Sequence, residues 1–406
     1  MNYKVKNVYG KTNNKEIIVT VPGSKSITAR ALLIAAIANG ESVLSGAQFS
    51  NDCATFLKCL TDLKIKAEVN GTTVKICGCN GVLPAKKAEI YVGSAGTAAR
   101  FIPAFLAFQS GEYTLNCSEQ MKTRPVKPLI NTLSALGAKF EFHEKENAYP
   151  FTIFGASNPA TAVNVDISES SQFLSALLIS AACAKKTVKI SPYGSHGLDY
   201  VKMTVNMMRS FGAAISENDG DFTVSGGYSA QNYEIEPDLS AASYFYAMNK
   251  ILDANICVEG VGENSVQGDY KFIKLLQNFE GGKIDMGSFS DQALTLAAIA
   301  PYLKEPTEIC GVAHIRRQEC DRIAAIVQNL TAMGVKCEEF PDGVKICPSK
   351  PQPATIKTFG DHRVAMSFAL TGLRADGIVI ENCEVCAKTF ADYFDILEEV
   401  TAKLTK

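Results

Sequence analysis

The sequence lacks an excess of charge of either sign. It holds 40 Lys and Arg against 42 Asp and Glu, which gives a formal net charge of −2 over 406 residues. A protein that binds nucleic acid or an anionic membrane through its overall field needs a strong positive excess. We therefore expect neither partner, and any anion site must be built locally from cations that the fold brings together.

The sequence also lacks a long apolar run. No window is long enough and free enough of charge to span a membrane, and the opening residues Met1–Lys6 are polar rather than a secretory signal. We therefore expect a cytoplasmic protein of the bacterial type. Its 13 cysteines are then expected to be reduced thiols.

Histidine is scarce, with four in the chain. The pairs Cys77/Cys79 and Cys383/Cys386 have spacings found in metal sites, but a closed zinc site needs four ligands and no second CxxC is present. We expect no metal site, and we interpret the cysteines as small buried apolar residues.

One stretch couples a polar turn to a run of strong helix formers, residues 22–38. Lys25 lies at the expected start of the helix, where the dipole and the free N–H groups favour an anion, and Arg30 adds a cation one turn later. A capped core helix with surface charges explains the stretch equally well. A P-loop is disfavoured, because Ser24 stands where that loop has glycine before its lysine.

The same pattern returns along the chain: a polar cap, an apolar helix, a strand, an amphipathic helix and a hairpin. Six copies begin at cap positions Ser24, Ser94, Ser170, Ser240, Asp291 and Asp361. Units of about 70 residues, packed three to a domain, predict two domains. The first helix of each copy is apolar all round, so we expect these helices inside and the sheets outside.

Cations recur at the expected helix starts and in the adjoining loops, together with a few acids. The cations are Lys25, Arg30, Arg100, Arg124, Arg316, Arg317, Arg322, Arg363 and Lys388, and the acids are Asp291, Glu319 and Asp321. Any one of them is more simply a cap, a buried ion pair or a surface charge. Their recurrence at equivalent ends favours a substrate pair with several negative charges, because arginine binds carboxylate and phosphate in bidentate fashion.

Seven motifs, taken together and in order, resemble the EPSP synthase (3-phosphoshikimate 1-carboxyvinyltransferase) family over essentially the whole chain. They occupy residues 23–30, 95–100, 121–125, 170–173, 319–322, 361–363 and 387–394. The resemblance implies an α/β fold: a two-domain inside-out α/β barrel of the enolpyruvyl transferase type, each domain having three βαβαββ repeats with buried parallel helices. It implies one domain from 1–20 plus 237–406, another from 21–236, and an active site in the cleft between them.

The resemblance implies transfer of the enolpyruvyl group of phosphoenolpyruvate to the 5-hydroxyl of shikimate 3-phosphate, with release of phosphate. It implies a monomer that uses no cofactor and no metal. By position, the implied catalytic residues are Asp291, Glu319 and Lys25. Those implied for shikimate 3-phosphate are Lys25, Ser26, Arg30, Ser170, Ser171, Ser195, Asp291 and Gln318. Those implied for phosphoenolpyruvate are Lys25, Gly96, Arg124, Gln172, Arg322, Arg363 and Lys388.

Two departures from the family pattern carry predictions. Gln318 stands where the family usually has lysine, and we hypothesise that Arg316 or Arg317 supplies the missing charge. Gly96 leaves room beside the enolpyruvyl group, which predicts inhibition by glyphosate. Phe101 replaces a common proline behind Gly96, so the degree of sensitivity stays open.

Two other readings remain to be compared. UDP-N-acetylglucosamine enolpyruvyl transferase is similar in fold and donor, but it typically has Asn where this chain has Ser26, and Ser26 with Arg30 favours a small phosphorylated acceptor. A repeat scaffold without activity would also explain six copies. It would not require Asp291, Glu319 and so many cations at helix starts.

Overall fold

The chain is described by a computed structural model over residues 1–194 and 197–406, and it divides into two compact units. Unit 1 comprises Met1–Pro22 and Pro237–Lys406, and unit 2 comprises Gly23–Glu236. The chain passes from one unit to the other after Pro22 and returns after Glu236. The predicted boundaries were 20/21 and 236/237.

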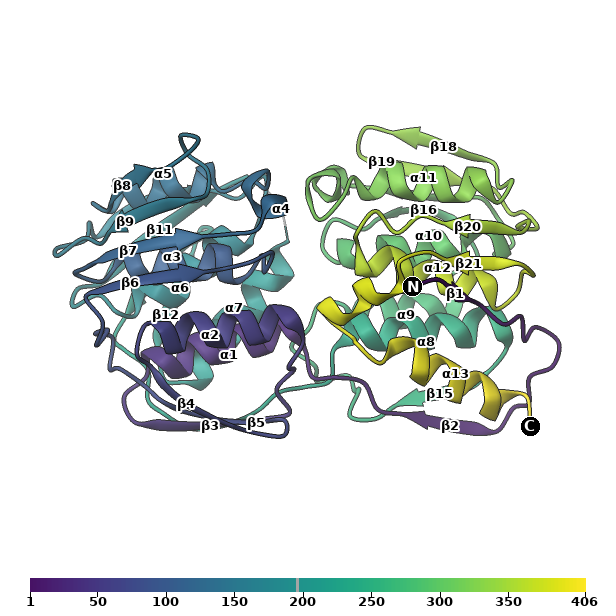
Figure 1. Ribbon diagram of the computed structural model, residues 1–406, viewed down its shortest axis with the longest axis horizontal. Coiled ribbons are helices and arrows are strands. Elements are labelled where there is room, and N and C mark those ends of the chain that lie inside the picture. The colour runs from purple at the N-terminus through teal and green to yellow at the C-terminus, as the bar shows by residue number, and fades with distance from the viewer. Residues whose placement is uncertain (195–196) are drawn as a thin grey trace. The chain divides into compact units, whose positions relative to one another are not determined.

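Unit 2 has three four-stranded sheets around its helices (Figure 1). The sheets have the strand orders β14-β3-β5-β4, β6-β7-β9-β8 and β10-β11-β13-β12. Their strands are β3 (Glu41–Ser45), β4 (Lys66–Asn70), β5 (Thr73–Cys77), β6 (Lys87–Tyr91), β7 (Glu112–Asn116), β8 (Lys139–Phe142), β9 (Phe151–Phe154), β10 (Ala162–Asp166), β11 (Val188–Tyr193), β12 (Ala214–Asn218), β13 (Asp221–Ser225) and β14 (Asn232–Glu234). The helices are α1 (Lys25–Ile37), α2 (Asn51–Asp62), α3 (Ala98–Ala107), α4 (Glu119–Lys122), α5 (Lys127–Ala135), α6 (Gln172–Ala181) and α7 (Leu198–Ser210).

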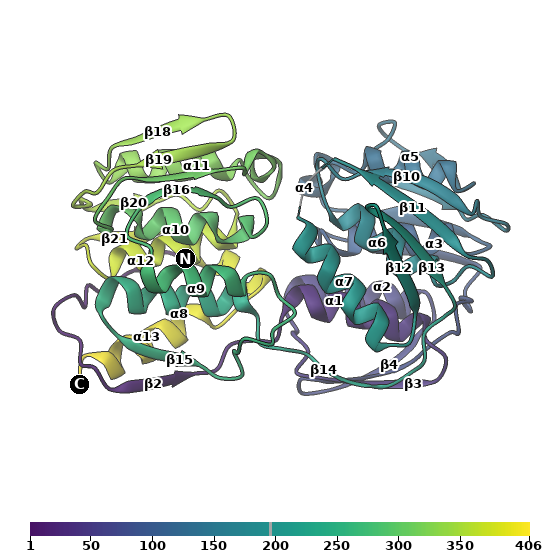
Figure 2. The same ribbon diagram turned by 180° about the vertical axis from the view of Figure 1, so that it is seen from behind.

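Unit 1 repeats this plan, with two of its three sheets smaller than those of unit 2, as Figure 2 shows from behind. Their orders are β1-β21-β20, β15-β2 and β16-β17-β19-β18. The strands are β1 (Tyr3–Lys4), β2 (Glu16–Val19), β15 (Asn255–Val258), β16 (Gly282–Asp285), β17 (Thr307–Cys310), β18 (Cys337–Phe340), β19 (Gly343–Ile346), β20 (Ala354–Ile356) and β21 (Ile378–Ile380). The helices are α8 (Leu239–Leu252), α9 (Tyr270–Asn278), α10 (Ala293–Ile299), α11 (Arg322–Ala332), α12 (His362–Gly372) and α13 (Tyr393–Leu404), with short 3₁₀ turns η1 (Ser290–Gln292), η2 (Ala300–Tyr302), η3 (Ala313–Arg317) and η4 (Cys383–Lys388).

The first helix of each repeat lies inside its unit, as its all-round apolar sequence predicts. Every residue of α3, α10 and α12 is buried, and α1 is buried from Ile27 onward. In unit 1 the three inner helices α8, α10 and α12 contact one another. The second helix of each repeat buries one face, as in α2 and α9. The two-unit α/β fold with inner helices therefore confirms the predicted fold class.

Only two of the six predicted caps directly precede a helix and also bond to its first turn through their side chains. Ser24 caps α1 and Asp361 caps α12. The other helices begin elsewhere: α3 follows Thr97 rather than Ser94, and α6 follows Ser171 rather than Ser170. Helix α8 is capped by Asp238, which leaves Ser240 in the first turn, and Asp291 lies in η1 before α10. A polar side chain next to a helix start is a cap only when the backbone turns at that residue.

The predicted burial of the cysteines is only partly correct. Cys53, Cys59, Cys383 and Cys386 are buried, whereas Cys77 is exposed at the end of β5. Over the ranges 1–194 and 197–406, no helix is both long and apolar enough to cross a bilayer.

Candidate active site

In unit 1, six of the predicted site residues form one connected network. They are Asp291, Gln318, Glu319, Arg322, Arg363 and Lys388. They come from η1, from the N-terminal turns of α11 and α12, from the loop before α11, and from η4. The inner helices and their neighbours therefore bring residues nearly 100 positions apart in the sequence into contact.

Asp291 lies between two arginines. Its Oδ2 accepts a hydrogen bond from Arg363 Nη2 at 2.8 Å, and its Oδ1 accepts one from Arg322 Nη1 at 3.3 Å. The same Nη1 of Arg322 contacts the side-chain oxygen of Gln318. A carboxylate between two guanidinium groups is held in one orientation, which suits a group that must receive a proton from a bound hydroxyl.

Glu319 is surrounded by positive charge. Its Oε1 lies 3.1 Å from Lys388 Nζ, and its Oε2 lies 2.9 Å from His362 Nδ1 and 3.7 Å from Arg322 Nη2. Burial alone would raise the pKa of the Glu319 carboxyl, but the interaction with His362 and the charges of Lys388 and Arg322 hold that pKa well below its usual range. Glu319 is therefore ionised when no substrate is bound.

Asp361, which the sequence predicts only as a cap, anchors this network. It is fully buried, and its Oδ2 accepts from Arg322 Nε at 2.8 Å while its Oδ1 caps α12 through the Arg363 amide at 2.8 Å. The charge of Asp361 raises the pKa of the Arg322 guanidinium against the opposing effect of burial. His362 was also missed. Both residues lie within the motif 361–363, of which only Arg363 was assigned a role.

Oxygen and nitrogen atoms of Glu319, Asp361 and His362 lie within 4.8 Å of one another, which is close enough to share a metal ion. Arg322 and Lys388 already approach the same carboxylates. Two fixed cations beside a divalent ion would repel it, so the geometry favours ion pairs over metal ligation.

In unit 2, two arginines face the N-terminal turn of α3. A Cβ atom on Gly96 would lie 3.0 Å from Arg100 Nη1 and 3.0 Å from Arg124 Nη2. Arg100 donates to the carbonyl oxygens of Gly96 and Pro125, and Arg124 donates to that of Ser94. The Nε atoms of both arginines are buried without an acceptor among the described residues.

Burial, and then the charge of Arg124, lower the pKa of Arg100 to about 9. No carboxylate of residues 1–194 and 197–406 forms an ion pair with either arginine. Two adjacent cations held only by neutral groups are poorly compensated, and they would gain from an anion placed beside Gly96.

Lys25 and Arg30 lie on α1 in different surroundings. Lys25 Nζ is 3.4 Å from Asp52 Oδ2, an acid on α2 that the sequence analysis did not single out. Arg30 is only 2% exposed. Its guanidinium donates to Thr204 Oγ1 at 2.7 Å and to the Ser26 carbonyl at 2.9 Å, with longer contacts to Ser175 and Tyr200.

Burial lowers the pKa of Arg30 to about 10. The observed contacts tie α1 to α6 and α7, which makes Arg30 an interior anchor in this conformation. The direct contact between Arg30 and a substrate that the resemblance implies stays a prediction.

The three predicted residues before and at the start of α6 lie together at one helix end. Ser170 Oγ accepts from the Gln172 amide at 3.2 Å, and Ser171 is buried. Ser195 lies outside the described residues.

The hypothesis that Arg316 replaces the missing lysine at Gln318 is not supported by its contacts. Arg316 pairs with Asp321 at 2.9 Å and with Glu339 at 2.7 Å, and it donates to the carbonyls of Pro341 and Phe340. Its donors therefore point to the loop before α11 and to the β18–β19 hairpin. Arg317 is exposed and the question stays open for it.

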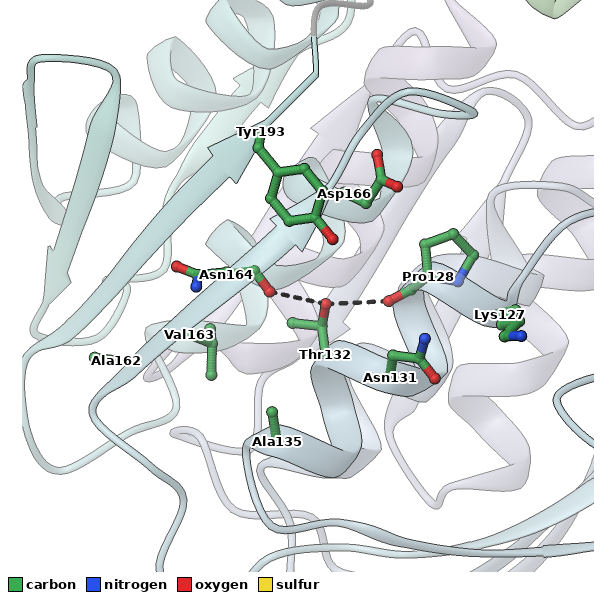
Figure 3. Close-up of a pocket in the computed structure, with 10 residues that line it drawn as sticks. All are labelled: Lys127, Pro128, Asn131, Thr132, Ala135, Ala162, Val163, Asn164, Asp166 and Tyr193. Atoms are coloured by element: carbon green, nitrogen blue, oxygen red, sulfur yellow. Dashed lines mark hydrogen bonds between the residues drawn. The ribbon is translucent and has the colours of Figure 1, made fainter.

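A separate cavity of about 500 Å³ opens between α5 and β10 in unit 2. Figure 3 shows its base, where Thr132 Oγ1 bonds to the carbonyls of Pro128 and Asn164, and Tyr193 lies above it. Of the predicted site residues within 1–194 and 197–406, none lines this cavity.

Comparison with known proteins gives one consistent result. The family model described as EPSP synthase (3-phosphoshikimate 1-carboxyvinyltransferase) matches residues 10–281 and 276–397. A 3-phosphoshikimate 1-carboxyvinyltransferase of Trichormus variabilis is 41% identical over 401 residues, which cover 93% of this chain and 94% of that protein. One from Escherichia coli O127:H6 is 36% identical over 410 residues, covering 94% and 96%.

Solved structures agree at the level of the fold. EPSP synthase from Acinetobacter baumannii matches with a TM-score of 0.83 at 22% identity, covering 98% of both chains. The enolpyruvyl transferase NikO from Streptomyces tendae matches with a TM-score of 0.72 at 15% identity, covering 98% of this chain and 96% of the other.

Proposed function

The chain belongs to the EPSP synthase family. We propose that the unit 1 network and the residues at the helix starts of unit 2 carry out the family's reaction. It is a 3-phosphoshikimate 1-carboxyvinyltransferase, an enzyme of the shikimate pathway. It transfers the enolpyruvyl group of phosphoenolpyruvate to the 5-hydroxyl of shikimate 3-phosphate and releases phosphate. The roles given to individual residues are our proposal.

The single observation that carries the assignment is the position of Asp291 and Glu319 in one network with three cations. In the addition step the 5-hydroxyl oxygen attacks C2 of phosphoenolpyruvate, while a proton adds to C3. We assign the hydroxyl proton to Asp291 and the proton on C3 to Glu319. Elimination then removes a proton from the methyl group and breaks the C–O bond to phosphate.

Glu319 must gain a proton before it can act as an acid, since its free carboxyl is ionised. Phosphoenolpyruvate brings a phosphate and a carboxylate, and both would pair with Arg322, Arg363 and Lys388. Those cations would then stabilise the Glu319 carboxylate less, so its pKa would rise when the donor binds. Donor binding would thereby load the acid with the proton that the addition step consumes.

For the donor we also propose Lys25, Gly96, Arg124 and Gln172, from the helix starts of unit 2. Arg124 and Arg100 are poorly compensated cations beside Gly96, which is the surrounding that a phosphate or carboxylate needs. For shikimate 3-phosphate we propose Ser26, Ser170, Ser171 and Ser195 together with Asp291 and Gln318. Arg30 supports this set by holding the Ser26 carbonyl at 2.9 Å.

Glyphosate inhibition is proposed on the same geometry. Gly96 has two guanidinium groups as neighbours. Phe101 is buried, with its ring centroid 5.3 Å from the Arg30 guanidinium and 6.3 Å from that of Phe56. We therefore expect inhibition competitive with phosphoenolpyruvate. The absence of inhibition at millimolar glyphosate would reject this proposal.

Phosphate release tests the acceptor. The purified protein is supplied with phosphoenolpyruvate and either shikimate 3-phosphate or UDP-N-acetylglucosamine. We expect release only with the first. Release only with the second would overturn the roles of Ser26, Ser170 and Ser171, and release with neither from folded protein would favour the scaffold reading. The monomeric state and cytoplasmic location also remain proposals, which sedimentation velocity and cell fractionation would test.

A further inference from the structure

A buried carboxyl group lies beside the unit 1 network without a role in the reaction proposed so far. Asp269 is at the start of α9 and is 4% exposed. Its Oδ1 accepts a hydrogen bond from Gln292 Nε2 at 2.9 Å. Gln292 is completely buried and directly follows Asp291 in η1. A carboxyl group removed from water in this way needs an explanation, because its desolvation is costly.

Two routes connect Asp269 to Asp291. One is the backbone of η1, since Gln292 is the next residue. The other runs through side chains: Gln292 Nε2 also donates to Ser240 Oγ at 3.1 Å, and Ser240 Oγ accepts from Arg363 Nη2 at 3.3 Å. The same Nη2 donates to Asp291 Oδ2 at 2.8 Å. The orientation of Gln292 thus fixes groups on three elements, α8, η1 and α12.

The charged groups that act on Asp269 come from each of these elements. Burial raises the pKa of Asp269, and the negative charges of Asp291 and Asp238 raise it further. The Gln292 hydrogen bond and the charge of Arg363 lower it, and the balance places the pKa at about 7. The charge of this carboxyl therefore changes close to neutral pH.

We propose that Asp269 is a positioning residue for the transfer reaction: through Gln292 it orients Asp291 and Arg363, and its negative charge strengthens Asp291 as a proton acceptor. The proposal rests on the assignment of Asp291 as the base. The electrostatic coupling of two carboxylates is reciprocal, so a charge on Asp269 makes Asp291 hold the hydroxyl proton more tightly. The hydrogen bonds supply the orientation, which persists when Asp269 is neutral.

A pH dependence follows from this arrangement. Below about pH 7 Asp269 is neutral, and Asp291 acts as a base without a second negative charge beside it. Above that pH Asp269 is ionised, and kcat should rise with an inflection near pH 7. Neither substrate touches Asp269 in this proposal, so the KM values should change little across the inflection.

The test is the kcat–pH profile of Asp269→Asn between pH 5.5 and 9. Asparagine keeps the volume and can still accept from Gln292, but it carries no charge. We expect the inflection near pH 7 to disappear and kcat at pH 8.5 to fall about tenfold, within the range of acid–base effects. Both KM values should stay within about threefold of wild type, because the amide keeps Arg363 in place. Asp376→Asn, at an exposed acid of the same unit, is the control and should keep the wild-type profile.

Asp291→Asn separates the inference from the function on which it rests. Activity retained in Asp291→Asn would overturn the base assignment and this inference with it. If Asp291→Asn lost activity but Asp269→Asn kept the wild-type pH profile, the base assignment would stand and the role of Asp269 would be overturned. A wild-type profile without an inflection near pH 7 would also overturn the role of Asp269. If Asp269→Asn does not fold, Gln292→Met replaces it. That variant breaks both hydrogen bonds, and we expect it to lower kcat and to raise KM for phosphoenolpyruvate severalfold. Unchanged constants in Gln292→Met would reject the positioning role.

Discussion

The two units share one repeat plan but treat their buried arginines in opposite ways. In unit 1, Arg322 lies 2.8 Å from the fully buried Asp361 and also contacts Asp291 and Glu319. In unit 2, Arg30 and Arg100 are held by hydroxyl and carbonyl oxygens. The same residue type is therefore neutralised by acids in one unit and only solvated by dipoles in the other.

The pKa directions follow this difference. Burial lowers the pKa of Arg30 to about 10, and burial with the neighbouring Arg124 lowers that of Arg100 to about 9. Burial acts on Arg322 in the same direction, but the charges of Asp361, Glu319 and Asp291 outweigh it and raise the pKa. A cation without a compensating acid gains most from a bound anion, whereas a cation among carboxylates controls their protonation.

This comparison assigns different duties to the two units. The unit 2 arginines would mainly hold the anionic groups of the substrates. In unit 1 the cations would pair with the donor, while Asp291 and Glu319 move protons. Substitution of these two acids should then act on kcat, and substitution of the unit 2 arginines should act on KM.

The largest effect is expected for the unit 1 acids. Asp291→Asn and Glu319→Gln keep size and hydrogen bonding but remove proton transfer, so each should lower kcat about 10³-fold. Steady-state phosphate release measures kcat, and far-UV circular dichroism checks that each variant is folded. A loss confined to KM would contradict the duty given to unit 1.

Arg124→Met should give the next largest effect. It removes a cation beside Gly96 while keeping the aliphatic stem, and we expect KM for phosphoenolpyruvate to rise about 100-fold, as for loss of a charged hydrogen-bonded pair. KM for shikimate 3-phosphate is the internal control and should change little. A reduced kcat with an unchanged donor KM would break the contrast between the units.

Gln318→Lys should have a smaller effect of opposite sign. Arg316 is engaged with Asp321 and Glu339, so it does not supply the charge that a lysine would bring to the site. We expect the Kd for shikimate 3-phosphate to fall about tenfold, which is the effect of one added charged contact. Calorimetric titration measures this Kd. An unchanged Kd would indicate that another cation, such as Arg317, already compensates.

The smallest effect concerns stability. Asp269 and Glu319 contribute to the pH dependence of the free energy of unfolding with opposite signs. The pKa of Asp269 is raised to about 7, so its contribution to the free energy of unfolding decreases as pH rises from about 4 to 7. The pKa of Glu319 is lowered, so its contribution is present above pH 4.5 and is lost on acidification. Asp269→Asn should remove the first decrease, and Glu319→Gln the second. Urea unfolding of the wild type and of each variant across this pH range measures these contributions. If the free energy of unfolding depended on pH in the same way in all three proteins, the two pKa shifts would be contradicted.

The sequence predicted the elements better than their contacts. The inner helices are recognisable because residues such as those of 31–38 are apolar on every side. Asp361 was recognised as a cap, since capping is local, but its pairing with Arg322 joins residues 39 positions apart and leaves no local signal. Arg30 is a similar case. Its place in a motif predicts a substrate contact, which stays a prediction, while its contacts with Thr204 and Ser175 on two distant helices left no local signal.

Asp269 was missed for a related reason. It precedes an ordinary amphipathic helix, where an acid is the expected residue at a helix start. Only the tertiary contact with Gln292 shows that it is buried beside the network.

The most direct test of the division between the units is the proton balance of donor binding. Phosphoenolpyruvate is titrated into the Asp291→Asn variant saturated with shikimate 3-phosphate. We expect this variant to bind both substrates and to turn over about 10³-fold more slowly than the wild type. Calorimetry is done in two buffers that differ in ionisation enthalpy. The account predicts a net uptake of protons on donor binding. This uptake should disappear in the double variant that carries both Asp291→Asn and Glu319→Gln. Equal binding enthalpies in the two buffers would contradict it, because the unit 1 cations would then not control the protonation of Glu319.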